Sequence, residues 1–150
     1  MRIIDINDLS NDEVKKLIEE LKNFLKPTEI EIPQLGKYKK EAYLIGKQHG
    51  VEYKFHIYRG NIQHKYSIHL RFVNNDVHLV RLCINGTKHH NEDGTIVNKN
   101  HIHIYKKRNN HIENYAYDLT KFPFDENSEL SKGVEDFLAY VNIHEGNEAT

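Results

Sequence analysis

The residues YKFHIY at positions 53–58 and YSIHLRF at positions 66–72 decide the fold class of this chain. In both stretches apolar side chains alternate with polar ones. A period of two is typical of a β-strand with one buried face, and strands of this kind form antiparallel sheets that keep their second face polar. We therefore expect an antiparallel sheet, and its polar face should carry histidine and arginine.

Further strands are predicted on both sides of this pair, at residues 41–47, 77–84, 101–105 and 115–119, because turn residues such as the NEDG at 91–94 separate the apolar patterns. A capping box from Ser10 to Glu13 and apolar residues at helical spacing predict a helix that continues until Pro27. The same spacing predicts a second helix at 131–142. The sequence thus predicts one α+β domain over residues 1–150, a five- or six-stranded antiparallel meander packed on an N-terminal and a C-terminal helix. The acidic tail at 144–150 should be disordered.

Composition narrows the class of protein. The only cysteine is Cys83, so an intrachain disulfide is excluded, and the residues after Met1 do not resemble a secretory signal. No apolar run approaches the length that spans a membrane. We expect a cytoplasmic protein with no membrane partner.

The charges are segregated along the chain, although the net charge is only -1. Residues 37–108 contain fourteen Lys or Arg against five acids, while residues 1–36 contain five against eight and residues 109–150 two against nine. Nine of the eleven histidines lie in the basic segment. This segregation favours nucleic-acid contact by the basic part. It is equally compatible with acidic helices that pack beside a basic sheet and neutralise it.

Two histidine pairs, His89-His90 and the pair in His101-Ile102-His103, form the candidate site. If the strands at 77–84 and 101–105 form a hairpin that buries both apolar sets, Leu82 faces Ile104 and Ile84 faces Ile102. The polar face then has Cys83 opposite His103 and Arg81 opposite Tyr105. The loop between the strands brings His89 and His90 to the rim. The predicted site is completed by His101, and His56, His69 and Arg71 flank it.

The segment that contains the two histidine pairs resembles a known sequence motif. The stretch NGTKHHNEDGT at 85–95, followed by HIHIY at 101–105 and YAY at 115–117, resembles the central motif of a family of small uncharacterised bacterial and phage proteins. That motif is Asn-Gly-x-x-His-x-Asn-Pro-Asp-Gly and then His-x-His-x-Tyr. Its positions correspond here to His89, Asn91, Asp93, Gly94, His101, His103 and Tyr105, whereas Thr87, Lys88 and Glu92 replace prolines. The resemblance implies a site at these residues and the same order of helix, sheet and closing helix, but no activity.

The first hypothesis is a metal-independent, toxin-like ribonuclease without a cofactor. Cleavage of RNA at the 2′-hydroxyl requires two groups that exchange protons, a cation for the phosphorane charge and an aromatic ring for stacking. The candidate catalytic residues are His89, His101, His103, Tyr105 and Arg81. The candidate nucleic-acid contacts are Arg71, Lys88, His90, Lys106, Lys107 and Arg108.

Three alternatives stay open. His89, His101 and His103 supply three nitrogen ligands for zinc, which would leave one position for water. The same basic and aromatic residues could serve a non-catalytic nucleic-acid-binding or inhibitor protein, with a cognate antitoxin or an effector protein as its partner. In the structural alternative, the histidines only decorate the polar face, and His89 and Asn91 organise the loop through hydrogen bonds.

Overall fold

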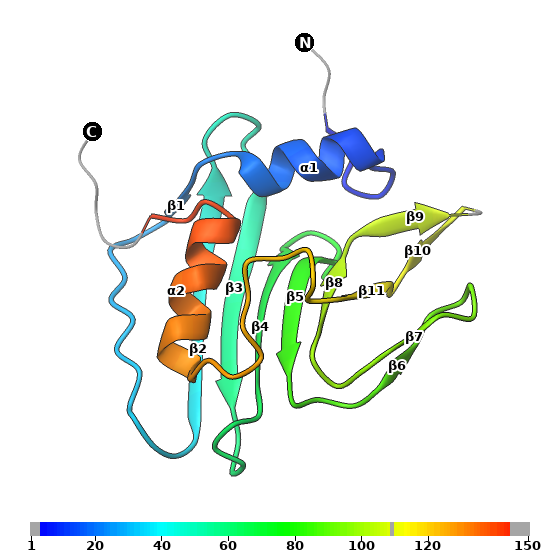
Figure 1. The fold of residues 1–150 in the computed structure, drawn as a ribbon. Coiled ribbons are helices and arrows are strands. Elements are labelled where there is room, and N and C mark those ends of the chain that lie inside the picture. Colours follow the sequence, from blue (N-terminus) through cyan, green and yellow to red (C-terminus); the bar gives the residue numbers. More distant parts are fainter. Residues whose placement is uncertain (1–3, 109, 145–150) are drawn as a thin grey trace.

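The computed structural model describes residues 4–108 and 110–144, which form an antiparallel sheet with two helices packed on one of its faces (Figure 1). The sheet has seven strands, one more than the upper prediction, in the order β1 (Lys22–Phe24), β2 (Tyr38–Gly46), β3 (Glu52–Arg59), β4 (Tyr66–Phe72), β5 (His78–Ile84), β8 (His101–Ile104) and β11 (Ala116–Asp118). Each strand pairs with the next sheet strand along the chain, so the predicted meander is confirmed.

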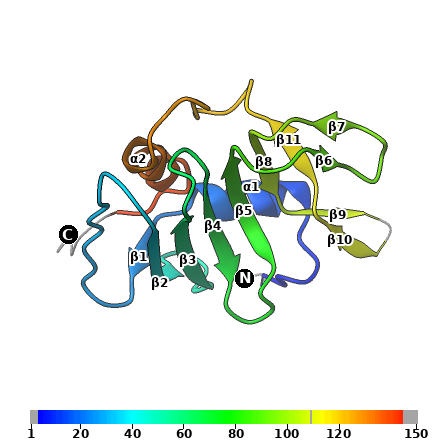
Figure 2. The ribbon, with the colours of Figure 1, turned by 90° about the horizontal axis from the view of Figure 1, so that it is seen from below.

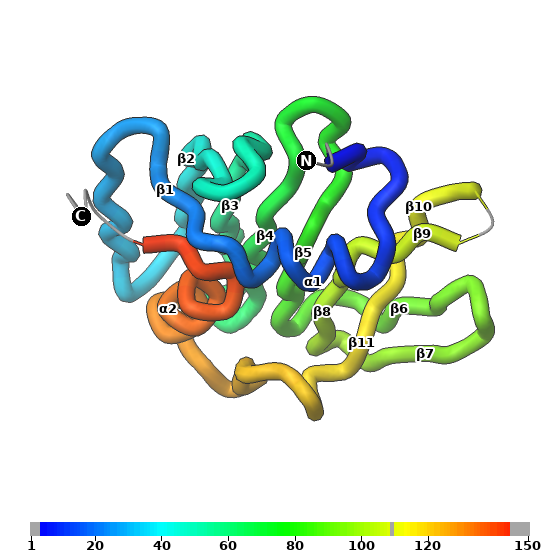
Figure 3. Tube along the Cα trace, turned by 90° about the horizontal axis from the view of Figure 1, so that it is seen from above, coloured from blue at the N-terminus to red at the C-terminus, as the bar shows by residue number. Residues whose placement is uncertain are grey.

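The helices α1 (Asn11–Glu19) and α2 (Leu130–Tyr140) lie on the same face of the sheet, as the view from above makes clear (Figure 3). The capping box is present, because the Ser10 hydroxyl accepts a hydrogen bond from the Glu13 amide and the Glu13 carboxylate accepts one from the Ser10 amide. The apolar faces of both helices and the apolar faces of the strands form one core. Within the described part of the chain, neither helix has the length and apolar character needed to cross a membrane.

The first helix is shorter than predicted. It ends at Glu19, and residues 22–24 form the edge strand β1 instead of a further helical turn. The side chain of Lys22 explains the change, because its ammonium donates to the carbonyls of Ile18, Glu20 and Val141 at 2.7–3.0 Å. These bonds satisfy carbonyl groups that the end of the helix leaves unpaired, and they join α1 to the end of α2.

Two short hairpins, which the sequence did not predict, extend from the sheet beside β8 and β11 (Figures 1 and 2). One consists of β6 (His89–His90) and β7 (Ile96–Val97), and the other of β9 (Lys106–Arg108) and β10 (His111–Glu113). The predicted disordered tail lies outside the described residues except for His144.

The predicted register between β5 and β8 is wrong by two residues. Arg81 pairs with His103 and Cys83 pairs with His101, so neither Tyr105 nor His103 has the partner that the sequence suggested. The face predicted for Arg81, Cys83, His101 and His103 is nevertheless correct, because a shift of two residues preserves the alternation.

Candidate functional site

The polar face of the sheet carries a straight row of cross-strand neighbours. His56 on β3 pairs with His69 on β4, His69 with Arg81 on β5, and Arg81 with His103 on β8. A parallel row contains Ser67, Cys83 and His101. The sheet therefore places His103 in the same row as His56 and His69, which were predicted to flank the site, and His101 in the parallel row.

Three imidazoles from two separate segments converge at the end of these rows. The ring of His89 lies 4.9 Å from that of His103 and 5.9 Å from that of His101, and the rings of His101 and His103 are 4.8 Å apart, measured between centroids. His89 belongs to the β6–β7 hairpin, whereas the other two belong to β8. The structure thus brings together three of the five predicted catalytic residues, and Arg81 adjoins them through its pairing with His103.

One of these rings has a fixed tautomer. The Nδ1 atom of His101 lies 2.7 Å from the carbonyl oxygen of Asn98. Since a carbonyl can only accept, Nδ1 carries the proton and Nε2 keeps a free lone pair. This arrangement is typical of histidines that bind metals through Nε2. The Nδ1 atom of His103 is buried and has no hydrogen-bond partner among the described residues.

Burial keeps both β8 imidazoles neutral. His101 is 3% exposed and His103 is 6% exposed. Loss of hydration lowers the pKa of His101, and it lowers the pKa of His103 to about 3, with the neighbouring imidazoles and Arg81 acting in the same direction. At neutral pH these rings can accept a proton or bind a cation, but they cannot supply a proton.

Cys83 joins the two histidines, although the sequence analysis did not include it in the site. One ligand atom from each of Cys83, His101 and His103 lies within 4.8 Å of the other two. Desolvation raises the pKa of the Cys83 thiol, and the nearby Arg81 guanidinium partly offsets that effect. The signal was present in the sequence, because alternation already placed Cys83 on the polar face.

The remaining motif residues build the loop that presents His89. The Asn91 side chain donates to the Ala116 carbonyl and accepts from the Ala116 amide, both at 2.9 Å, so it binds the outer edge of β11 as a strand would. The Asp93 carboxylate accepts from the Thr95 amide and hydroxyl and from the Tyr115 hydroxyl, and these bonds lower its pKa to about 2. Gly94 adopts a φ of 91°, which favours glycine. These residues have a structural role in the loop.

The placement of Tyr105 on the polar face is wrong. Its ring is 4% exposed in the apolar core, and its hydroxyl donates to the Ile6 carbonyl and accepts from the Leu9 amide. The pairing of β4 with β5 shifts between Leu70 and Arg71, so Leu79 is an extra residue in β5 that has no partner in β4. The Tyr105 amide donates a hydrogen bond to the carbonyl of this extra residue. An extra residue shifts the alternation, which here turns Tyr105 toward the helices.

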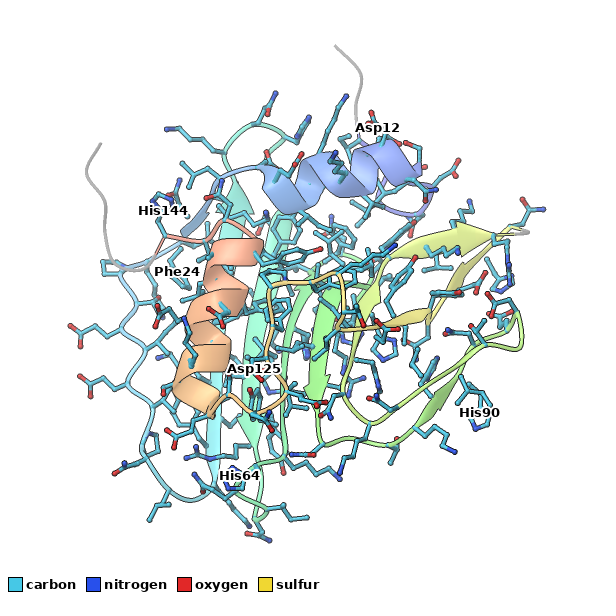
Figure 4. The ribbon with its side chains drawn as sticks, viewed as in Figure 1. Asp12, Phe24, His64, His90, Asp125 and His144 are labelled. Carbon is cyan, nitrogen blue, oxygen red and sulfur yellow. The ribbon has the colours of Figure 1, made fainter. Side chains whose placement is uncertain are left out.

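Most of the predicted nucleic-acid contacts are engaged with other side chains. Arg71 pairs with Asp76 at 3.6 Å, Lys107 with Asp8 at 3.0 Å and Arg108 with Glu113 at 2.6 Å. The Lys106 ammonium lies 4.0 Å from the centre of the Tyr115 ring. Lys88 and His90 are exposed on the connection to β6 and on β6 itself, and His90 lies at the outer side of the hairpin (Figure 4).

A second histidine cluster occupies the middle of the polar face. The ring of His69 lies 4.7 Å from that of His56 and 4.5 Å from that of His78. Desolvation and the neighbouring positive groups lower the pKa of His69 to about 2 and that of His78 to about 4. Sequence alternation assigned His56 and His69 to this face but gave no indication that the rings touch.

The fold and the site define an α+β protein that gathers neutral imidazoles on the polar face of an antiparallel sheet. The chain belongs to a family described as "Family of unknown function (DUF6978)", whose sequence profile matches residues 9–143. Searches of curated proteins and of solved structures found no match.

Proposed function

We propose that this protein binds a zinc ion through Cys83, His101 and His103. The observation that carries the proposal is the convergence of one thiol and two neutral imidazoles, whose ligand atoms lie within 4.8 Å of one another. Neutral imidazole and thiolate are the ligands that zinc prefers. The bond from His101 to the Asn98 carbonyl holds that ring so that Nε2 faces away from the carbonyl and is available as a ligand.

This ligand set differs from the three histidines suggested by the sequence, since Cys83 takes the place of His89. His89 is partly exposed and is the nearest further imidazole. Three protein ligands leave a fourth position for water or for His89. The first arrangement suits hydrolysis and the second suits a structural site, so the role of His89 distinguishes them.

Metal analysis of protein purified without a histidine tag tests the proposal. We expect about one zinc per chain, and we expect cobalt to replace it with a thiolate-to-cobalt absorption band in the near ultraviolet. The Cys83→Ser variant should lose that band while His90→Ala, on the outer side of the hairpin, keeps it. Circular dichroism confirms that each variant is folded. Fewer than about 0.1 equivalents of metal after zinc loading, or a cobalt spectrum unchanged by Cys83→Ser, would refute the proposal.

The second candidate is the metal-independent ribonuclease, which is favoured by one observation. Arg81 pairs with His103 across the sheet, so a cation adjoins the imidazoles that would exchange protons with RNA. His103 is neutral at neutral pH and would have to be the base, although a pKa of about 3 makes it a weak one, and His89 would have to be the acid. Tyr105 has no part in this version because its ring lies in the core.

An RNA cleavage assay separates the two candidates. Cleavage that persists in excess chelator and is lost in His103→Ala supports the ribonuclease, and cleavage that needs zinc supports a hydrolytic metal site. Salt-dependent RNA binding without cleavage under either condition would instead favour the nucleic-acid-binding alternative.

A further inference from the structure

A hollow of about 440 Å³ opens on the polar face where β3 and β5 end and β4 begins, next to the proposed zinc ligands but separate from them. Its polar lining comes from Tyr58, Asn61, Lys65, Ser67 and Arg81, and from Tyr66, whose hydroxyl already donates to the Ser128 carbonyl. None of the described residues that line the hollow is acidic. Two cations, an amide and two hydroxyl groups therefore converge without a carboxylate to neutralise them.

The Arg81 side chain carries a charge that has no counter-ion among the described residues. Its Nε atom is buried without a hydrogen-bond partner among the described residues, and no carboxylate of that part of the chain forms an ion pair with it. Its neighbours across the sheet are the neutral imidazoles of His69 and His103, and on its own strand it contacts the Cys83 thiol. A partly buried charge without a counter-ion is unfavourable, so a folded protein usually pairs it. Because the Arg81 side chain lines the hollow, an anion bound there would supply the missing counter-ion.

Other features of the hollow suit a ligand that carries a ring as well as a charge. The Tyr58 ring is 48% exposed at its edge and offers a stacking surface. The absence of a side chain at Gly60 leaves room for the Tyr58 ring, because a Cβ at residue 60 would lie 3.0 Å from the Tyr58 hydroxyl. The volume lies within the range of about 300–1,000 Å³ that small-molecule sites occupy.

We propose that this hollow binds the phosphate group of a nucleotide, with Arg81 and Lys65 on the phosphate and Tyr58 against the base. Arginine is suited to the phosphate because its planar donors bond two oxygens at once. The Ser67 hydroxyl can donate to a third oxygen. The same chemistry serves a free nucleoside monophosphate or a 5′-phosphorylated RNA end. The inference depends neither on zinc nor on ribonuclease activity.

Calorimetric titration of chelator-treated protein tests the proposal without any metal. We expect saturable binding of adenosine monophosphate and at least tenfold weaker binding of adenosine. Inorganic phosphate alone should bind detectably but more weakly than the nucleotide. A 5′-phosphorylated dinucleotide compared with its unphosphorylated form shows whether an RNA end binds better than the free nucleotide.

Variants locate the binding. Arg81→Met should reduce nucleotide affinity at least tenfold and Lys65→Met severalfold, whereas Lys121→Met, at an exposed lysine that does not line the hollow, should have no effect. Arg81→Met should also unfold at the same or a higher temperature than the parent, because it removes an unpaired charge. Equal binding of adenosine and its monophosphate, no binding of any phosphate compound, or the same loss in Lys121→Met overturns the inference. Since no step uses zinc, failure of the zinc proposal leaves this test unaffected.

Discussion

The buried imidazole of His69 should make the protein sensitive to mild acid. Its side chain is 7% exposed, lies against the rings of His56 and His78, and has a buried Nε2 without a hydrogen-bond partner among the described residues. Desolvation, reinforced by His78, His56 and two arginines, lowers its pKa to about 2. The folded protein therefore keeps this ring neutral at pH 5, whereas an unfolded chain protonates it with a pKa of about 6.5.

The sign and size of the effect follow from proton linkage. Below pH 6.5 the unfolded state binds a proton that the folded state does not, so the free energy of unfolding falls as the pH falls and the loss continues toward the folded-state pKa. At about 1.4 kcal/mol per pH unit, acidification from pH 7 to pH 5 should cost about 2 kcal/mol at this one residue.

Urea denaturation of the parent and of His69→Phe at pH 7 and pH 5 measures this difference. The phenylalanine keeps a ring in the row but cannot be protonated, so the variant should lose about 2 kcal/mol less stability than the parent between the two pH values. Ser67→Ala, on the same strand and the same face, is the control and should lose as much as the parent. Equal losses in the parent and His69→Phe would show that the ring is hydrated and would refute the argument.

Three further substitutions test other contacts. Lys22→Met should destabilise the protein by roughly 3 kcal/mol or more in urea denaturation, because three buried carbonyls lose their donor; a loss below about 1 kcal/mol would contradict this role. Tyr105→Phe should cost about 1–2 kcal/mol and leave zinc stoichiometry unchanged, since its two hydrogen bonds lie on the helix side of the sheet, and a loss of zinc would return Tyr105 to the site. Asn91→Ala should accelerate hydrogen exchange at residues 89–97 at least tenfold, because the bonds to Ala116 attach this hairpin to β11; unchanged exchange would mean that they do not hold the hairpin.

The sequence correctly predicted which face of the sheet carries the site residues, but it did not predict which of these residues pair across the strands. It placed His101, His103, Arg81 and Cys83 together because the side-chain period of a strand is a local property. It could not identify the partners of these residues, since registers that differ by two bury the same apolar set. The positions of Tyr105 and Leu79 were equally inaccessible, because the break in alternation arises where β4 and β5 pair.

The charges also show which properties can be predicted from the sequence and which depend on the tertiary structure. The basic segment from 37 to 108 was evident from the sequence, but the pairing of Lys107 with Asp8 and of Arg108 with Glu113 depends on the tertiary structure. Arg81 differs from these residues because no carboxylate of the described residues reaches it. Only the folded chain distinguishes a neutralised cation from one that lacks a counter-ion.

By itself the sequence determined the N-terminal cap of the first helix, six of the seven strands of the sheet, the face on which most of their side chains lie and the segment that carries the histidines. These features depend on residues close together in the chain. The tertiary structure alone decided that His89 meets His101 and His103, that Cys83 pairs with His101 and not with His103, that Tyr105 enters the core, and that Lys22 ends the first helix. Each of these depends on register, on a local break in the ladder or on a contact between distant segments, and the free energy that selects among the alternatives comes from packing of the whole domain.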